Sequence, residues 1–129
     1  MHGVALIEVL VAILIFMLGV LGLIGLQSGM TRSATESKIR ADAVYLASEV
    51  VGRMWADADN LTAYAGDDTC SATSCTEWRT KVAQVLPSGG AAITVNSLNG
   101  DVSVTVTWQL GDGIPHQHVT TTTIVSKSS

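Results

Sequence analysis

The chain has 129 residues, of which 47% are apolar and 14% charged, and its formal net charge is −4. This length allows one domain, and the apolar content excludes a disordered chain. An acidic balance without a cluster of Lys and Arg gives no electrostatic footprint for nucleic acid. The sequence therefore predicts no nucleic-acid partner.

The first 30 residues hold a single charged side chain, Glu8, and every other charge lies between Arg32 and Lys127. Residues 4–26 form an apolar run, which as a helix is about 34 Å long, enough for a hydrocarbon core of about 30 Å. A cleaved secretory signal has a shorter apolar stretch, and an ordinary signal anchor has no acid inside it. The run predicts one membrane-spanning helix and contact with lipid.

Glu8 is the unusual residue of this run. An ionised carboxylate in hydrocarbon costs roughly 2.5 to 3.5 kcal/mol on insertion scales. Two interpretations are open: the side chain reaches the headgroups from its place near the end of the span, or it meets a positive group of another molecule. An intramembrane acid is by default a functional residue, which favours the second.

The residues around this acid, Gly3-Val4-Ala5-Leu6-Ile7-Glu8-Val9-Leu10-Val11-Ala12, resemble the prepilin motif of type IV pilins and type II secretion pseudopilins. The resemblance implies cleavage after Gly3 by a prepilin peptidase, methylation of the new N-terminal Val4, and use of Glu8 in filament assembly. The new α-amino group is positive at neutral pH and can neutralise Glu8 of an adjacent subunit.

The motif departs from the family at two places. The family usually has Phe where this chain has Val4, and a basic leader where this chain has only Met-His before Gly3. Residues 1–3 are therefore interpreted as a leader remnant, and the expected methylation of Val4 is less secure than the cleavage.

Three glycines, Gly19, Gly22 and Gly25, lie in the second half of the run. Each costs a helix interior about 1 kcal/mol relative to Ala. They either allow neighbouring membrane helices to approach closely or give the helix flexibility inside a filament. Major pilins tend to carry a Pro in this region, so glycine here is more typical of minor pilins and pseudopilins.

Beyond the run, apolar residues recur at steps of three or four, which predicts one stripe of an amphipathic helix. The stripe consists of Ile39, Ala43, Leu46, Val50, Met54, Ala58 and Leu61. With no Pro before position 87, one helix is expected from about residue 4 to about residue 60, and ordinary core packing explains the stripe.

Cys70 and Cys75 are the only cysteines, and we expect them to form a disulfide outside the cytoplasm. Closing this six-residue loop is worth about 2 kcal/mol on the chain-entropy model. The rival is a zinc site with His116 and His118, which is disfavoured because those two are spaced i, i+2 and lie far along the chain. No metal or cofactor is predicted.

A capping box at Ser74-Cys75-Thr76-Glu77 predicts a second helix that ends at Pro87. Residues 91–96, 102–108 and 118–125 are predicted to be strands of an antiparallel meander. The fold class is therefore α+β: a long N-terminal helix, with a hydrophobic membrane half and an amphipathic outer half, packed on a small antiparallel sheet of about three strands. The expected division is 1–3 leader remnant, 4–26 transmembrane and filament-core helix, and 27–129 periplasmic globular domain.

Pilins and pseudopilins have this same arrangement, and within them the chain resembles PilV-type minor pilins most. The residues concerned are Leu18-Gly19-Val20-Leu21-Gly22-Leu23 with Gln27, Ala43-Val44-Tyr45-Leu46-Ala47-Ser48-Glu49, Arg53-Met54, and Trp78 before Leu86-Pro87. The resemblance implies a structural subunit of the inner membrane and then of the pilus at the cell surface. Its implied partners are the prepilin peptidase, other minor pilins, the major pilin, the inner-membrane assembly platform and a tip adhesin.

Three other functions are alternatives to a minor pilin. A minor pseudopilin of a type II secretion system is the nearest alternative, and a single-pass membrane-anchored periplasmic binding domain that never enters a filament is the next. An enzyme is disfavoured because the sequence offers no nucleophile beside a base, no carboxylate pair in one motif and no glycine-rich phosphate loop.

Overall fold

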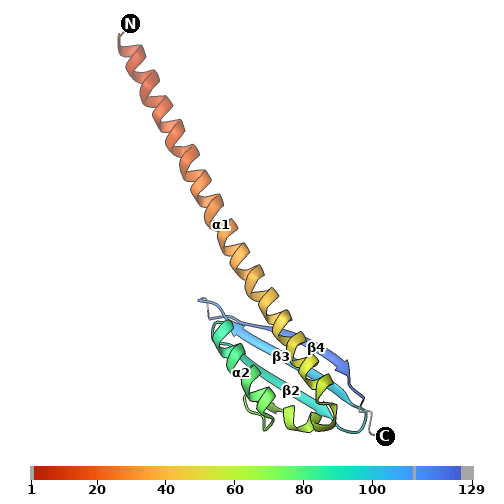
Figure 1. Cartoon of the computed structure of the whole chain (residues 1–129). Coiled ribbons are helices and arrows are strands. Elements are labelled where there is room, and N and C mark those ends of the chain that lie inside the picture. The colour runs from red at the N-terminus through yellow and green to blue at the C-terminus, as the bar shows by residue number, and fades with distance from the viewer. Residues whose placement is uncertain (1, 112, 126–129) are drawn as a thin grey trace. The chain divides into compact units, whose positions relative to one another are not determined.

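The computed structural model describes residues 2–111 and 113–125 (Figure 1). Its elements are α1 (His2–Ala56), the 3-10 helix η1 (Ala58–Tyr64), β1 (Gly66–Asp67), α2 (Thr73–Val85), β2 (Gly90–Asn96), β3 (Asp101–Gln109) and β4 (Pro115–Thr123). The chain divides into two compact units between Lys38 and Ile39, and these are described separately below. The α+β fold class expected from the sequence is confirmed.

The second unit is built on one antiparallel sheet with the strand order β1-β2-β3-β4. The turn between β2 and β3 uses Gly100 at a φ of +80°, and a Cβ there would collide with the carbonyl of Ile124. Only glycine adopts this conformation at little cost, so the turn fixes the register of the two strands.

The sheet has four strands, where about three were expected. β1 is a strand of two residues, Gly66 and Asp67, which pair with Ile93 and Ala92 of β2. Two residues are too few to show an alternation of apolar and polar side chains, so no pattern predicts this strand. The last strand also differs from the expected range 118–125, because β4 begins at Pro115 and ends at Thr123.

The core lies between the sheet and the two helices, which cover the same face of the sheet. α1 buries the middle of the predicted stripe, Ala43, Leu46, Val50 and Met54, while Ile39 and, in η1, Ala58 and Leu61 are partly buried. β3 buries every second residue, as its alternation predicts. The buried core residues are Ala43, Leu46, Ala47, Val50, Met54, Tyr64, Cys75, Trp78, Val82, Leu86, Ala91, Ile93, Val102, Val104, Val106, Trp108 and Ile124.

α2 does not begin with the predicted capping box. Its first residue is Thr73, its N-cap is Ala72, and no side chain caps it. Ser74 lies inside the helix, where its hydroxyl and its backbone carbonyl both accept hydrogen bonds from Arg53 of α1, at 3.2 Å and 3.0 Å. The Ser74 side chain therefore contacts α1 instead of capping its own helix.

An ion pair joins α1 to α2 beside this contact. The ammonium of Lys81 donates to both carboxylate oxygens of Glu49 at 3.0 Å, and Arg53 donates to Glu49 at 3.3 Å. Partial burial disfavours the charged form of Glu49, but the hydrogen bonds and charges of Lys81 and Arg53 outweigh it and lower its pKa. The two helices are thus held by charge as well as by apolar packing.

Candidate functional site

The N-terminal unit is the part of the chain with the clearest functional signal. Residues 2–38 all lie on α1, and every one of them is exposed. The most apolar 18-residue window of this helix has a mean hydropathy of 3.0, and none of it is buried. Water-exposed surfaces rarely carry so large an apolar patch. Within the described residues, α1 is the one helix long and apolar enough to span a membrane, which is consistent with single-pass anchoring.

Glu8 lies on this exposed helix among apolar neighbours. The residues one turn away on the same face are Val4, Ala5, Val11 and Ala12, and none can pair with a carboxylate. No basic group of the described residues forms an ion pair with Glu8. Among residues 2–111 and 113–125, Glu8 therefore has no charged partner.

The predicted cleavage site lies one helical turn before Glu8. Gly3 is in the first turn of α1, and a Cβ added to it would meet no atom within 4 Å. Val4 follows with 69% of its side chain exposed. The bond between the two is at the surface of the helix, and its cleavage and the methylation of Val4 stay predictions.

The three glycines of the apolar run are helical, and α1 continues through them. A Cβ at Gly19, Gly22 or Gly25 would meet nothing within 4 Å, and the same holds for Gly29. Contacts within this chain therefore do not explain these glycines. Gly25 and Gly29 form a small-xxx-small pair of the kind that packs against another membrane helix, a pair that the sequence reasoning did not use.

The predicted disulfide is present in the second unit. Cys70 and Cys75 are joined by an S–S bond of 2.06 Å, with their Cα atoms 6.2 Å apart. Cys75 is a buried residue of the first turn of α2, and Cys70 lies in the loop before that helix. The bond closes the loop that leads from β1 into α2.

Arg79 fastens this loop to the sheet. Its guanidinium donates to the backbone carbonyls of Gly66 in β1, at 2.7 Å, and Ala91 in β2, and its Nε lies 3.1 Å from Cys70 Sγ. Burial lowers the pKa of Arg79, an effect that the charges of Asp68 and Asp67 oppose. Sequence reasoning missed this residue, because nothing near it in the chain shows that two carbonyls would meet its side chain.

The two histidines of the second unit are kept apart from the cysteines. His116 stacks on Trp108 with ring centroids 5.8 Å apart, and the His118 Nε2 atom lies 3.0 Å from the hydroxyl of Thr120. The cysteines that a zinc site would need are bonded to each other. Across residues 2–111 and 113–125, no three metal-ligating side chains lie close enough to hold an ion.

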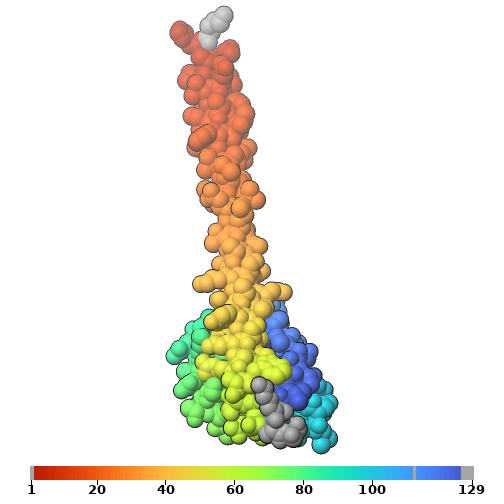
Figure 2. Space-filling view, turned by 45° about the vertical axis from the view of Figure 1, so that its right-hand side comes forward, coloured from red at the N-terminus to blue at the C-terminus, as the bar shows by residue number. Residues whose placement is uncertain are grey.

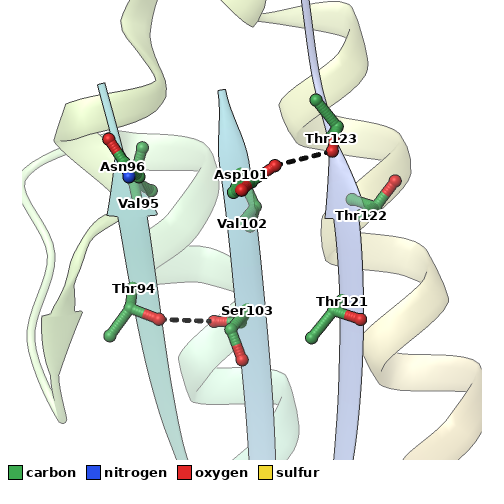
Figure 3. Close-up of a pocket in the computed structure, with 9 residues that line it drawn as sticks. All are labelled: Thr94, Val95, Asn96, Asp101, Val102, Ser103, Thr121, Thr122 and Thr123. Atoms are coloured by element: carbon green, nitrogen blue, oxygen red, sulfur yellow. Dashed lines mark hydrogen bonds between the residues drawn. The ribbon is translucent and has the colours of Figure 1, made fainter. Parts of the chain in front are cut away.

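An open depression of about 550 Å³ crosses the sheet (Figure 3). Hydroxyl groups of Thr94, Ser103, Thr121 and Thr123 line it, together with the carboxylate of Asp101. Thr123 donates to Asp101 at 2.7 Å, so that carboxylate is already engaged. The lining can form hydrogen bonds.

Comparison with known proteins adds no family: no family model, no curated protein and no solved structure matches the chain. The function is therefore argued from the residues described above. Among these, Glu8 and the exposed apolar helix carry the most specific chemistry.

Proposed function

We propose that the chain is a minor pilin, a non-enzymatic structural subunit that resembles PilV-type minor pilins. In this proposal residues 4–26 insert in the inner membrane, the prepilin peptidase cuts after Gly3, and the subunit takes part in priming or tip assembly of a type IV pilus. The observation that carries the proposal is Glu8, a single carboxylate on an exposed apolar helix with no partner among the described residues.

The electrostatics of this residue support an intermolecular role. Cleavage after Gly3 leaves an α-amino group at Val4 that is positively charged at neutral pH. Both that amine and Glu8 cost free energy when they are buried singly, and pairing them removes most of the cost. A neighbouring subunit that brings its amine to Glu8 therefore gains stability from an arrangement that the isolated chain does not offer.

The position of the core is compatible with transfer of the apolar half of α1 from the membrane into a filament. No residue before Ala43 is buried in the core of the second unit. The apolar half of α1 can therefore pass from lipid to a protein environment without loss of core contacts. The prepilin peptidase, the other minor pilins, the major pilin and the assembly platform are the proposed partners of this half.

The proposal is tested by intact-mass and N-terminal analysis of the protein from native membranes and from sheared surface filaments, in strains with and without the prepilin peptidase. We expect a Val4 start that disappears without the peptidase. Gly3→Val should block processing, and Gly22→Val, a matched change later in the same helix, should leave it intact.

The outcomes separate the alternatives. A Val4 start together with recovery from sheared filaments supports the pilus. A Val4 start with retention in the envelope instead indicates a type II secretion pseudopilin. A start at Met1 in both strains refutes processing and leaves a membrane-anchored binding domain.

A further inference from the structure

The two sulfur atoms of the disulfide lie in different surroundings. Cys75 is fully buried, and its Sγ lies 3.7 Å from the backbone carbonyl oxygen of Tyr64. Cys70, in the loop before α2, is partly exposed. The segment from β1 to the end of α2, drawn in yellow-green to green, lies at the surface of the second unit in Figure 2. A reagent in solution therefore reaches Cys70 more readily than Cys75.

A positive charge lies beside Cys70. The Nε atom of Arg79 is 3.1 Å from Cys70 Sγ, within hydrogen-bond distance for sulfur. The other nitrogen atoms of this guanidinium donate to two neutral backbone carbonyls of the sheet. Asp67 and Asp68 act on its charge from a distance, but neither forms an ion pair with it. The charge of Arg79 is therefore not neutralised by direct contact with a carboxylate.

The contact between Arg79 and Cys70 does not depend on the disulfide bond. The two amides that follow Cys70 both donate to the Ala63 carbonyl at 3.1 Å, and the amide before it donates to the Asp67 carbonyl at 2.7 Å. Arg79 is held by carbonyls of β1 and β2. Because the loop and the guanidinium each have their own hydrogen bonds, we expect them to stay together when the two cysteines are reduced.

The reduced cysteines should therefore differ in reactivity. The thiolate, not the thiol, attacks a disulfide, and a guanidinium beside a cysteine favours the thiolate. At Cys75, burial and the nearby Tyr64 carbonyl, which accepts a hydrogen bond from a thiol, favour the neutral form. The first turn of α2 favours the thiolate of Cys75, but a buried sulfur is closed to a large reagent whatever its charge. Cys70 is the better nucleophile toward another protein.

We propose that Cys70 is the residue at which a thiol–disulfide oxidase, an enzyme that carries a reactive disulfide, reacts with the folded, reduced chain. The Cys70 thiolate attacks one sulfur of that disulfide, which forms a mixed disulfide and releases the other sulfur as a thiolate that takes up a proton. Cys75 then loses its proton to water and attacks Cys70 Sγ, and the oxidase leaves as a dithiol. Two electrons thus pass from the cysteines to the oxidase.

This inference goes beyond the proposed function. It assigns a class of partner, and the residue that this partner contacts, in the second unit. Cleavage after Gly3 and filament assembly do not enter the exchange or its test. Failure of either claim therefore leaves the other standing.

The test uses the full chain, purified in detergent and reduced. A brief pulse of iodoacetamide labels reactive thiolates, and fragment-ion mass spectrometry measures the label on each cysteine. At neutral pH we expect about tenfold more label on Cys70 than on Cys75, and equal labelling in urea, where the fold is lost. With oxidised glutathione as the probe of exchange, Cys75→Ser should form a mixed disulfide about tenfold faster than Cys70→Ser.

Equal labelling of the folded chain, or more label on Cys75, overturns the proposal. Labelling that is the same in detergent and in urea also overturns it, because the reduced chain would then not hold the arrangement. Thermal unfolding shows whether each serine variant folds. Where one does not, the wild-type labelling decides alone, since it needs no substitution.

The part played by Arg79 has its own readout. The rate of Cys70 labelling at neutral pH, divided by its rate above the ordinary cysteine pKa of about 8.5, reports the thiolate fraction. Arg79→Gln should lower this ratio by about threefold or more, and Arg79→Lys, which keeps the charge, should recover part of it. Lys81→Gln removes a positive charge from the same helix and should leave the ratio unchanged. An unchanged ratio in folded Arg79→Gln would refute the role of the guanidinium.

Discussion

The indole N–H of Trp78 in α2 donates a hydrogen bond of 2.7 Å to the backbone carbonyl of Leu46, in the part of α1 that belongs to the second unit. Both residues are buried. A helical carbonyl has two lone pairs, and its own i+4 amide uses one, so this contact joins the helices without opening α1. It fixes how α2 sits along α1, which apolar packing alone leaves adjustable.

Replacing Trp78 tests that contact. Trp78→Phe keeps an aromatic ring but leaves a smaller side chain and no donor to the Leu46 carbonyl, so we expect the free energy of unfolding to fall by about 1 to 3 kcal/mol. Trp78→Ala should cost about 3 to 5 kcal/mol. Urea unfolding of the full chain in detergent measures both. Trp55→Phe, at a residue 49% exposed, is the control and should change stability by less than about 0.5 kcal/mol.

Glu49 should stabilise the second unit through its ion pairs. Glu49→Gln keeps the shape but loses the charge that Lys81 and Arg53 face, so we expect a loss of about 1 kcal/mol, discounted because Lys81 is partly solvated. Glu36→Gln, in the exposed pair with Arg32 at 3.5 Å, is the matched control. Equal losses in the two variants would contradict a special role for Glu49.

The same residue predicts a pH dependence. The pKa of Glu49 is lower in the folded chain than its ordinary value. Its contribution is therefore present above the unfolded pKa and is lost as the pH falls through the folded pKa. The stability difference between wild type and Glu49→Gln should shrink as the pH is lowered from neutral into the acid range. A difference that stays constant over that range would argue against the ion pair.

The disulfide should stabilise the second unit by restricting the unfolded chain. Replacing both Cys70 and Cys75 by Ser is expected to lower the free energy of unfolding by about 2 kcal/mol. Arg79→Lys, which cannot reach the Gly66 and Ala91 carbonyls with one planar group, should destabilise as well. Because Arg79 also contacts Cys70, we expect the two effects to be non-additive in a double-mutant cycle.

Glu8→Ala should separate membrane insertion from assembly. The variant loses no contact with the described residues, so its unfolding should match the wild type, and its insertion should be at least as favourable because the cost of the carboxylate is gone. Its recovery in sheared filaments should fall by about tenfold or more, the equivalent of about 1.4 kcal/mol. Glu8→Asp should recover part of this and Glu8→Gln little, since pairing with an amine requires charge. Normal recovery of Glu8→Ala would contradict the assembly role.

Much of the fold follows from local patterns. Leu46, Val50 and Met54 lie at helical spacing, and Val102, Val104 and Val106 alternate with polar residues, and all six are buried as predicted. The helix was expected to run to about residue 60. Instead α1 ends at Ala56, and the chain then forms the 3-10 helix η1, in which the φ and ψ angles of Asn60 are not helical. That break is set by the tertiary structure, which the apolar stripe does not report.

The edge strand shows where sequence patterns stop being informative. His118 and Thr120 lie on the core side of the sheet, opposite Val106 and Val104, yet both are polar and only partly buried. The sequence pattern predicts only that residues 118–125 form a strand of the meander. The polar side chains on the inner face of β4 are explained by its place as the last strand of the sheet, where inward side chains are only partly buried.

Residues 2–38 contribute no buried side chain to the core of the second unit. Substitutions there should leave the melting temperature of the second unit unchanged, whatever they do to insertion or assembly. The sequence of this segment is therefore limited by its contacts with lipid and with neighbouring chains, and not by packing in the core. Folding places no constraint on it, and a defect that maps to it is a defect of location or association.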